Sequence, residues 1–388
     1  MKARLWIAIA AALTAAAPLQ AQNATASEIV RDNPARWTAR QANTWYAKQD
    51  WILGANYMNA SAINQLDMFQ AATWNPREID NELGWAKQFG MNSMRVYLHD
   101  LLYKQDPEGF KRRFAELLSI ADRHGIRIMP VLFDSCWNPD PKLGPQHPPI
   151  PGVHNSGWVQ SPGRADLVNP ANDAHFRRYV EDMVRSFAND RRILLWDLWN
   201  EPDNWGGGSY NDAQLAEEQR RIEELLPQVF AWARAQKPTQ PLSSAVWIGD
   251  DWSPGSPSLK PIHRIQLAES DVITFHNYEW PEQFEARVAQ LRKYGRPLIC
   301  TEWMARSAGS TADAVLPIAH RENIGMINWG FVQGEIQTHL AWDSWERPYT
   351  LKPPTIWFHD LVRPDGKPYR EREAELFRAL SAKRAGRR

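Results

Sequence analysis

The chain has 388 residues, and its 45 lysines and arginines balance 45 aspartates and glutamates, so the formal net charge is zero. A protein that follows a phosphate backbone needs a basic block, and none occurs here, so we expect no nucleic-acid partner. The ten histidines show no H-x-H or H-E-x-x-H spacing, and the sequence has no glycine-rich phosphate loop. We therefore expect neither a metal site nor a cofactor.

The first residues have the organisation of a secretory signal peptide. An apolar run follows a basic start made by Lys2 and Arg4, and a cleavage site ends at Ala21. The run is short for a membrane anchor, although a retained N-terminal helix is the alternative interpretation. We expect a signal peptide over residues 1–21, a mature domain over residues 22–388, and a periplasmic or secreted protein.

The mature sequence gives no sign of a membrane anchor and has few cysteines. No later run of about 18 apolar residues occurs, so we expect no membrane span after cleavage. The two cysteines, Cys136 and Cys300, lie far apart in the sequence. An exported protein could pair them, but a chain of this length does not need a disulfide to fold.

Short apolar runs alternate with longer segments of helical periodicity along the chain. This alternation is typical of repeated βα units around a parallel sheet. Eight such runs and a helix near the end of the chain predict an α/β fold, a single-domain (β/α)8 TIM barrel. The predicted strands cover residues 51–57, 91–98, 125–134, 192–200, 241–247, 271–278, 297–303 and 324–331.

Helices are expected between these strands, where apolar residues recur at three- and four-residue steps. Asn75 followed by Pro76 is typical of an N-cap and a first-turn proline, and Gly90 and Gly125 are typical of helix C-termini. The clearest predicted helices cover residues 75–90, 107–125, 211–236 and 370–384.

The segments that follow the predicted strands are long, whereas those that precede the strands are tight. The longest runs from Asp134 to Pro170 and is rich in proline and glycine, and another covers residues 333–354. In a TIM barrel the loops after the strands build the active site. These two loops could narrow an open groove into a pocket and turn endo action towards exo action, a choice that the sequence leaves open.

Two glutamates end apolar strands on this predicted face. Glu201 closes the run "LLWDLWNE", and Glu302 lies in "PLICTEW". A neutral carboxyl can protonate a glycosidic oxygen while an ionised one attacks the sugar, so the pair suits glycosidic bond cleavage. A lone glutamate would be interpreted as a surface or salt-bridged group, but two, each beside a tryptophan, favour catalysis. If Asn200 and Glu201 both face a substrate, the strand must distort at its end, where Pro202 suits a break.

Five motifs, in order along the chain, resemble those of clan A glycoside hydrolases, and most closely family 5, the cellulase-like enzymes. The resemblance covers nearly the whole mature chain. It implies a retaining hydrolase of β-linked oligo- or polysaccharides that uses two glutamates. The motifs are "NSMRVYLH" (92–99), "WNEP" (199–202), "FHNY" (275–278), "TEW" (301–303) and "NWG" (328–330).

The resemblance implies a role for each matched residue in the reaction. Glu201 is implied to be the acid/base and Glu302 the nucleophile. Arg95 is implied to hydrogen-bond the nucleophile and stabilise its charge, and Asn200 to bind the sugar 2-hydroxyl.

Three further matched residues are implied to contact the sugar. His276 and Tyr278 would line the cleft, with the tyrosine touching the nucleophile, and Trp329 would floor the subsite of the cleaved sugar. Structural alternatives exist, because Arg95 could form a buried ion pair, and His276 and Trp329 could belong to the core.

The chain contains 20 tryptophans, many of them beside glycine, proline and asparagine, which is typical of loops. Loop tryptophans can stack on the apolar faces of sugar rings. The second long loop could also bring Glu335 over the substrate. The candidate subsite residues are Trp137, Trp158, Trp303, Gln337 and Trp342.

The third predicted strand departs from the family pattern. Many family 5 members carry a histidine where this chain has Asp134, Ser135 and Cys136. We therefore expect the contribution of this strand to the sugar subsite to be different or absent. Asp197, in the fourth strand, suits a polar network inside the barrel better than catalysis.

The implied roles set expectations for the two carboxyl groups. Arg95 and the Tyr278 hydroxyl should favour the anion of Glu302 and hold its pKa down. Negative charge on Glu302 should in turn raise the pKa of Glu201, which must stay protonated to act as an acid. We expect the carboxyl groups to lie about 5 Å apart, with retention of anomeric configuration.

Two other functions would use a similar cleft. A non-catalytic carbohydrate-binding barrel would keep the aromatic cleft but would not require both glutamates. A transglycosylase would use the same pair and transfer the sugar to an acceptor other than water. The sequence leaves the sugar, the linkage and the oligomeric state open.

Overall fold

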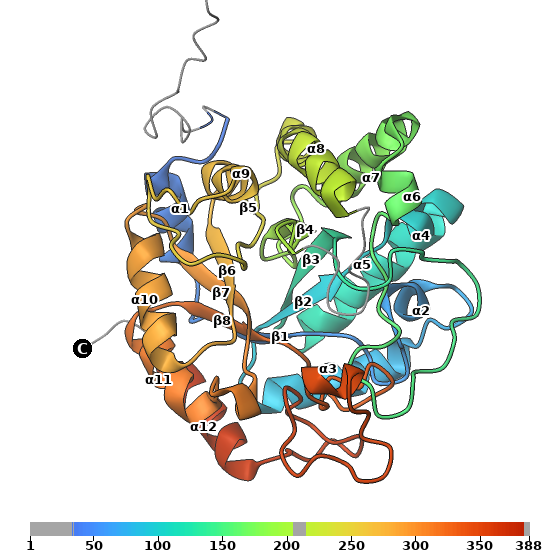
Figure 1. Cartoon of the computed structure of the whole chain (residues 1–388), viewed down its shortest axis with the longest axis vertical. Coiled ribbons are helices and arrows are strands. Elements are labelled where there is room, and N and C mark those ends of the chain that lie inside the picture. Colours follow the sequence, from blue (N-terminus) through green and yellow to red (C-terminus); the bar gives the residue numbers. More distant parts are fainter. Residues whose placement is uncertain (1–32, 34, 205–214, 384–388) are drawn as a thin grey trace, which may run out of the picture.

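The computed structural model describes residue 33 and residues 35–204 and 215–383, and its centre is a barrel of parallel strands (Figure 1). The strands are β1 Leu53–Asn56, β2 Ser93–Tyr97, β3 Arg127–Asp134, β4 Trp196–Asn200, β5 Leu242–Ser243, β6 Ile273–Asn277, β7 Leu298–Trp303 and β8 Gly325–Asn328. They are ordered β5-β4-β3-β2-β1-β8-β7-β6, and a bridge between Val246 and Phe275 joins the two ends. The predicted (β/α)8 barrel is confirmed.

Each observed strand lies within the range predicted for it. All strand residues are buried except Arg127, which is half-buried at the start of β3. This burial explains the continuous apolar runs, because strands of a barrel are covered by its interior on one face and by helices on the other. The fourth strand starts later than predicted, at Trp196, since Ile193 forms only an isolated bridge with Ile128.

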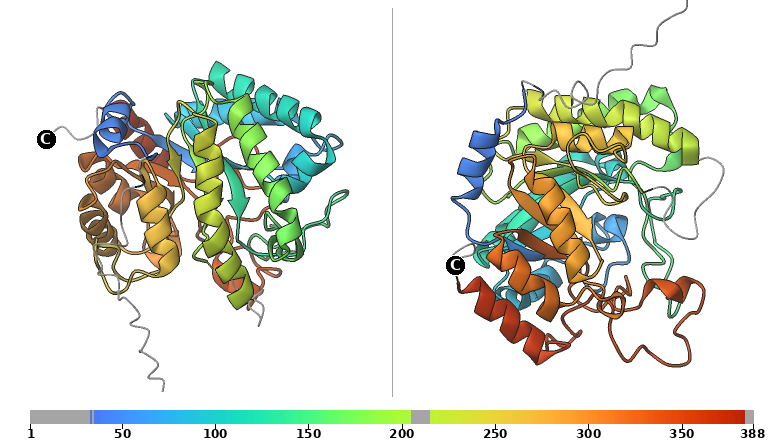
Figure 2. Two further views of the ribbon diagram at one scale, coloured as in Figure 1. Left: turned by 90° about the horizontal axis from the view of Figure 1, so that it is seen from above. Right: turned by 60° about the vertical axis from the view of Figure 1, so that its left-hand side comes forward.

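Helices surround the barrel on its outside (Figures 1 and 2). The α-helices are α1 Ala39–Tyr46, α2 Gln65–Phe69, α3 Pro76–Gln88, α4 Asp100–Gln105, α5 Pro107–Arg123, α6 Arg164–Leu167, α7 Asp173–Ser186, α8 Leu215–Ala235, α9 Pro261–Glu269, α10 Pro281–Arg292, α11 Ala312–Arg321 and α12 Glu371–Ser381. Short 3-10 helices are η1 Pro170–Asn172, η3 Arg306–Ala308 and η4 Trp342–Trp345.

The predicted helices correspond to α3, α5, α8 and α12, although residues 211–214 and 384 lie outside the described residues. The Asn75 side chain accepts a hydrogen bond from the backbone N–H of Glu78 at 3.2 Å, so it caps α3 as predicted. Gly90 and Gly125 follow α3 and α5 with φ of 76° and 71°. Their left-handed backbone explains why glycine ends these helices.

Helix α1 closes the end of the barrel at which the strands begin. Ala42 and Tyr46 of this helix pack on a separate apolar layer, and the Tyr46 hydroxyl donates to the Asn323 carbonyl at 3.2 Å. The opposite end, where the strands terminate, is left to the long loops, as in other TIM barrels. The layer beneath α1 consists of Ile52, Met129, Leu194, Leu195, Val272, Ile299 and Ile327.

Three other sequence predictions concern the chain outside the barrel core. The predicted signal peptide lies outside the described residues. Among the helices that the structure describes, none is long and apolar enough to cross a membrane. Cys136 and Cys300 are buried free thiols, so they form no disulfide with each other.

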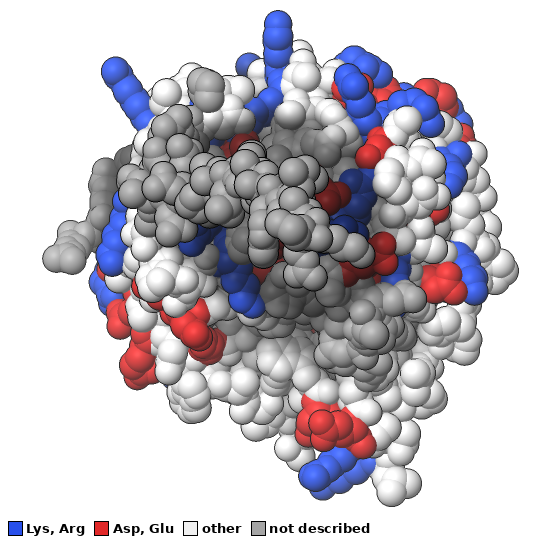
Figure 3. Space-filling view, turned by 45° about the horizontal axis from the view of Figure 1, so that its top comes forward, with Lys and Arg blue, Asp and Glu red and all other residues white. Residues whose placement is uncertain are grey.

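Charged side chains of both signs share the molecular surface. On the face shown in Figure 3, lysines and arginines are interspersed with aspartates and glutamates around the rim. The described part of this face therefore carries no block of a single sign.

A buried ion pair attaches α12 to the loops that follow β7 and β8. The Arg306 guanidinium donates to both carboxylate oxygens of Glu373, at 2.8 and 2.6 Å, and to the carbonyls of Trp357 and Asp360. Removing one partner of a buried pair leaves the other charge uncompensated, which is strongly destabilising.

Glu373→Ala should therefore lower the free energy of unfolding by about 3 kcal/mol, as measured by urea denaturation. The matched control is Glu371→Ala in the same helix, because Glu371 forms a more exposed pair with Arg378. This control should change stability by less than about 1 kcal/mol. Equal effects of the two substitutions would contradict the conclusion that the buried ion pair between Arg306 and Glu373 stabilises the fold.

Candidate active site

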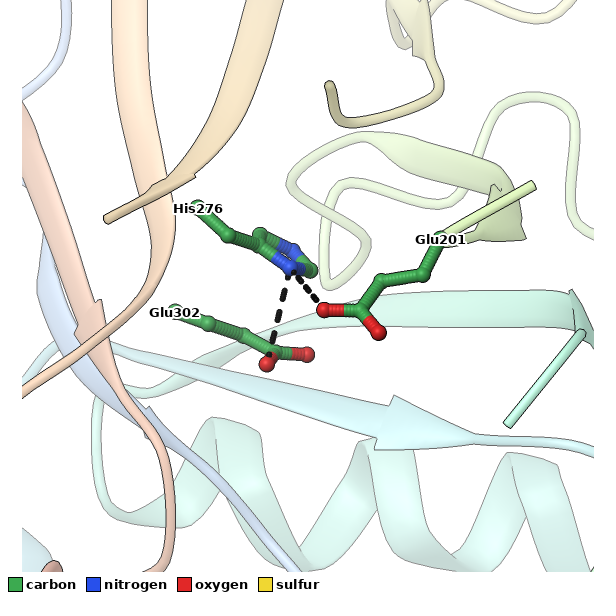
Figure 4. A group of neighbouring side chains, drawn as sticks. All are labelled: Glu201, His276 and Glu302. Carbon is green, nitrogen blue, oxygen red and sulfur yellow. Dashed lines mark hydrogen bonds and ion pairs between the residues drawn. The ribbon is translucent and has the colours of Figure 1, made fainter. Parts of the chain in front are cut away.

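Two glutamates and a histidine meet where the strands end. Glu201 follows β4, Glu302 lies in β7 and His276 lies in β6. One carboxylate oxygen from each glutamate and a ring nitrogen of His276 all lie within 4.8 Å of one another (Figure 4). Both glutamates line a cavity of about 480 Å³, so the structure brings the predicted catalytic pair together in one site.

The backbone distorts at Glu201, as predicted from the sequence. Its φ of 45° lies in the left-handed region, which is uncommon for a residue other than glycine. This turn breaks the strand alternation after Asn200, so both adjacent side chains reach the cavity. The adjacent polar pair in the sequence therefore reflects a bend at the end of β4.

Glu302 is held by donors from strand β2 and from the loop after β6. Its Oε1 accepts hydrogen bonds from Arg95 Nη1 and the Tyr97 hydroxyl, both at 2.8 Å, and its Oε2 accepts one from the Tyr278 hydroxyl at 2.6 Å. Burial nevertheless raises the pKa of Glu302, and His276, Arg95 and Tyr278 only oppose this rise. Arg95 and Tyr278 lower the pKa as expected, but the expected net direction is wrong, because the loss of hydration outweighs these donors.

Arg95 connects Glu302 to the rest of the barrel interior. This fully buried guanidinium also donates from Nε to Asp197 at 2.9 Å, from Nη1 to Asn56 at 2.8 Å, and from Nη2 to Asn200 at 2.7 Å. Arg95 therefore forms a buried ion pair with Asp197 inside the barrel and also contacts Glu302 in the cavity. Asp197 belongs to the interior network, as expected.

Glu201 has a different environment, in which no lysine or arginine among the described residues pairs with it directly. Its Oε2 accepts hydrogen bonds from the Cys136 thiol at 3.0 Å and from Asn204 Nδ2 at 2.8 Å, and its Oε1 lies 2.7 Å from His276 Nδ1. Burial raises the pKa of Glu201 to about 7, and the Cys136 and Asn204 hydrogen bonds lower it in part. The predicted rise is confirmed, but its main cause is burial rather than the charge on Glu302.

His276 lies between the two carboxyl groups. Its Nδ1 is 2.7 Å from Glu201 Oε1 and 3.5 Å from Glu302 Oε2. Burial lowers the pKa of His276 to about 4, so the ring is neutral near pH 7. These three are the candidate metal ligands among the described residues. The shortest separation is that of a hydrogen bond, which fits a proton shared between His276 and Glu201.

The third strand contributes through Asp134 and Cys136. Asp134 Oδ1 accepts hydrogen bonds from Asn200 Nδ2 at 2.8 Å and from the Cys136 backbone N–H at 3.1 Å. The Trp158 indole donates to the other oxygen of Asp134 at 2.5 Å. This strand therefore orients Asn200 and presents the thiol to Glu201, a contribution that the sequence left undefined.

The structure separates the predicted subsite residues into two groups. Trp137, Trp329 and Trp342 line the cavity. Trp158, Trp303 and Gln337 do not. The prediction that these three, or Glu335, contact a sugar in this cavity is therefore wrong.

Each residue outside the cavity has another place in the fold. Trp158 is buried beneath Trp329, at 5.4 Å between ring centroids, and Trp303 is buried and stacks on Phe377 of α12. Gln337 hydrogen-bonds backbone groups of the first long loop. Glu335 lines a separate surface depression.

Several residues of the site were missed by sequence reasoning. Tyr97, whose hydroxyl donates to Glu302, could have been found, because residues two apart in a strand share a face and Arg95 was already identified. No comparable sequence pattern marked the residues that the loops contribute to the cavity. The lining residues missed are Cys136, His154, Asn155, Asn204, Trp247, Trp345 and Glu346.

The cellulase model, glycosyl hydrolase family 5, matches residues 54–334, which is more than half of the chain. No curated protein matches.

Many solved structures are similar in fold. Exo-beta-1,4-mannosidase Op5Man5 from Opitutaceae bacterium strain TAV5 is 19% identical with a TM-score of 0.55, and the match covers 85% of this chain but 60% of that one. GH5_18 from Streptomyces cattleya, in complex with GlcNAc, is 13% identical with a TM-score of 0.57, covering 88% and 82%. The beta-1,4-mannanase from the sea hare Aplysia kurodai is 16% identical with a TM-score of 0.52, covering 72% and 88%.

Identities this low show a common fold and no more. The family match is stronger, because it extends from β1 to the loop after β8 and includes every strand of the barrel. The chain therefore belongs to glycosyl hydrolase family 5 and is an O-glycosyl hydrolase.

Proposed function

We propose that this glycoside hydrolase retains anomeric configuration, with Glu302 as the nucleophile and Glu201 as the acid/base. The observation that carries the proposal is the distance of at most 4.8 Å between a carboxylate oxygen of Glu201 and one of Glu302. Retaining glycosidases place their carboxyl groups about 5 to 5.5 Å apart, whereas inverting enzymes need about 6.5 to 9.5 Å to admit a water. The observed distance supports direct attack by a carboxylate on the sugar.

The hydrogen bonds around Glu302 support its role as the nucleophile. A guanidinium and two tyrosine hydroxyls donate to it, and an arginine remains protonated in proteins. Such donors stabilise a carboxylate more than a carboxylic acid. When the pair shares one proton, the anion therefore resides on Glu302.

The surroundings of Glu201 support its role as the acid/base. Its pKa of about 7 allows it to donate a proton near neutral pH. In the first step Glu302 bonds to the anomeric carbon while the glycosidic bond breaks, and Glu201 protonates the departing oxygen. In the second step Glu201 removes a proton from water, whose oxygen bonds to the anomeric carbon and releases Glu302.

The cavity supports a neutral carbohydrate as the substrate. Trp137, Trp247, Trp329, Trp342 and Trp345 all line it, and indole faces can cover the apolar faces of sugars. The names of the similar structures include a β-mannosidase, β-mannanases and a β-glucosidase. We therefore propose a β-linked hexose oligo- or polysaccharide, with β-mannosides and β-glucosides as the first candidates.

Glu302→Ala should reduce kcat by roughly 10⁴-fold or more on aryl β-glycosides, as expected when a covalent nucleophile is removed. Glu201→Ala should slow glycosides with poor leaving groups by about 10²- to 10⁴-fold but activated aryl glycosides far less, because only the former need a proton donor. The matched control is Glu335→Ala, an exposed glutamate outside the cavity, which should keep full activity.

Full activity of Glu302→Ala would refute the proposed role of Glu302 as the nucleophile and leave a carbohydrate-binding barrel as the alternative.

Proton NMR of the reaction should show the β-anomer of the released sugar first, followed by slow mutarotation. The reason is that two successive displacements at the anomeric carbon restore its configuration. Initial appearance of the α-anomer would contradict the proposed nucleophile and indicate an inverting reaction.

The thiol of Cys136 should shift the alkaline limit of activity, which is set by the proton of Glu201. The first step needs protonated Glu201, so kcat/KM should fall as pH rises through its pKa of about 7. Burial raises the pKa of Cys136 well above its usual range, so the thiol stays protonated and donates to Glu201. Cys136→Ala removes a donor that lowers the pKa of Glu201, so the alkaline limb should move to higher pH.

Cys136→Ser is the matched control, because its hydroxyl keeps a donor at the same position. The alkaline limb of this variant should stay closer to that of the unmodified enzyme than the limb of Cys136→Ala. If Cys136→Ala and Cys136→Ser had identical pH profiles, the hydrogen-bond donor at position 136 would not affect the pKa of Glu201.

A further inference from the structure

Two long loops of the catalytic face form one continuous structure. We call residues 135–163 the β3 loop and residues 329–370 the β8 loop. The Gln337 side chain donates to the carbonyls of Ile150 and Val153, at 2.8 and 3.0 Å, and accepts from the Gly152 N–H at 3.1 Å. One side chain of the β8 loop thus holds three backbone groups of the β3 loop.

Backbone and histidine contacts extend this junction on both sides of Gln337. The Asn155 N–H donates to the Ile336 carbonyl and the Tyr349 N–H to the Gly152 carbonyl, both at 2.9 Å. His154 adds a bond from its N–H to Ser344 Oγ and one between Nδ1 and the Leu340 carbonyl, again at 2.9 Å each. The two loops are therefore joined over about a dozen residues of the β8 loop.

The close approach at Gly152 requires glycine. Its φ is 75°, and a Cβ placed there would lie 2.7 Å from the backbone of Tyr349. A larger residue would push the two loops apart, so the sequence itself is adapted to this junction.

Aromatic rings continue the junction down to the cavity. Trp137 of the β3 loop stacks on Trp345 of the β8 loop, with 5.2 Å between centroids and 17° between planes. Trp342 packs edge-on against Tyr278 at 5.1 Å. We call the joined loops with these rings the wall. Its β3 loop contributes Trp137, His154 and Asn155 to the cavity lining, and its β8 loop contributes Trp342, Trp345 and Glu346.

The loop after β1 supports the wall from the outside. Gln70 exchanges two hydrogen bonds with the backbone of Gly144, and Asn64 and Gln65 donate to the carbonyls of Gly157 and Val159. The β3 loop is thus attached to two other loops of the catalytic face. Figure 1 shows the β3 and β8 loops, in green and in orange to red, side by side at the lower right.

The acid fixes the direction in which a substrate lies. Glu201 must contact the leaving-group oxygen, so the departing part of the substrate lies over β4 and β5, where Asn204 and Trp247 line the cavity. The sugar that bonds to Glu302 then lies on the other side, above Trp329. The wall stands directly beyond that sugar.

From this arrangement, which rests on the proposed roles of Glu201 and Glu302, we infer that the enzyme is exo-acting. The wall closes the end of the cleft that a continuing polysaccharide would occupy, so the cavity accepts the non-reducing end of a β-linked chain. A short unit is released from this end at each turnover, and internal bonds are not reached.

The test is the product pattern from β-1,4-linked manno- and gluco-oligosaccharides labelled at the reducing end. The exo mode predicts stepwise shortening from the non-reducing end and little early loss of viscosity of the corresponding polysaccharides. Early products from the middle of the chain, with aryl-glycoside activity intact, would overturn the inference but not the proposed function. Inactivity on aryl glycosides and oligosaccharides alike would overturn both.

Trp345→Ala removes one ring of the wall and should raise the ratio of internal to terminal cleavage about tenfold or more. Gln337→Ala, which breaks the junction without altering the cavity lining, should change the ratio in the same direction. The matched control is Trp280→Ala, an exposed tryptophan that is 60% accessible and lies outside the cavity lining. An unchanged ratio in both wall variants, with aryl-glycoside activity intact, would overturn the inference.

Discussion

The buried guanidinium of Arg95 is the interaction on which the geometry of the site depends. A buried positive charge is strongly destabilising unless its N–H donors are hydrogen-bonded. The donors of Arg95 bond to groups of β1, β4 and β7. Those contacts fix Asn200 and Glu302 relative to the barrel axis. Asn200 is also held by Asp134, so β3 is joined to the same network.

This network gives the two glutamates different hydrogen-bond partners. Glu302 accepts a hydrogen bond from the positively charged Arg95 guanidinium. Glu201 instead accepts hydrogen bonds from a thiol and an amide and lies next to the neutral His276 imidazole. Both carboxyl groups are buried, which by itself disfavours both anions. The difference in hydrogen-bond partners favours the negative charge on Glu302 and the proton on Glu201, as the proposed nucleophile and acid require.

The wall adds a geometric constraint to this chemistry. A barrel with short loops would leave the cleft open at both ends, and the same two glutamates could then reach any bond of a long chain. Here the β3 and β8 loops share hydrogen bonds, a glycine contact and a tryptophan stack. The strand ends thus position the proposed catalytic pair, whereas the loops determine the shape of the cleft.

The sequence by itself determined the barrel, its eight strands and the pair of glutamates, because these depend on local patterns of burial and on short motifs at strand ends. It also indicated the bend at Glu201 from two adjacent polar residues. Only the tertiary structure decided that Cys136 touches Glu201, that Trp158 and Trp303 are buried, and that Gln337 joins two loops. It also reversed the expected pKa direction of Glu302. The physical reason is the same in each case: loop contacts and desolvation are sums over residues far apart in the chain, which become neighbours only after folding.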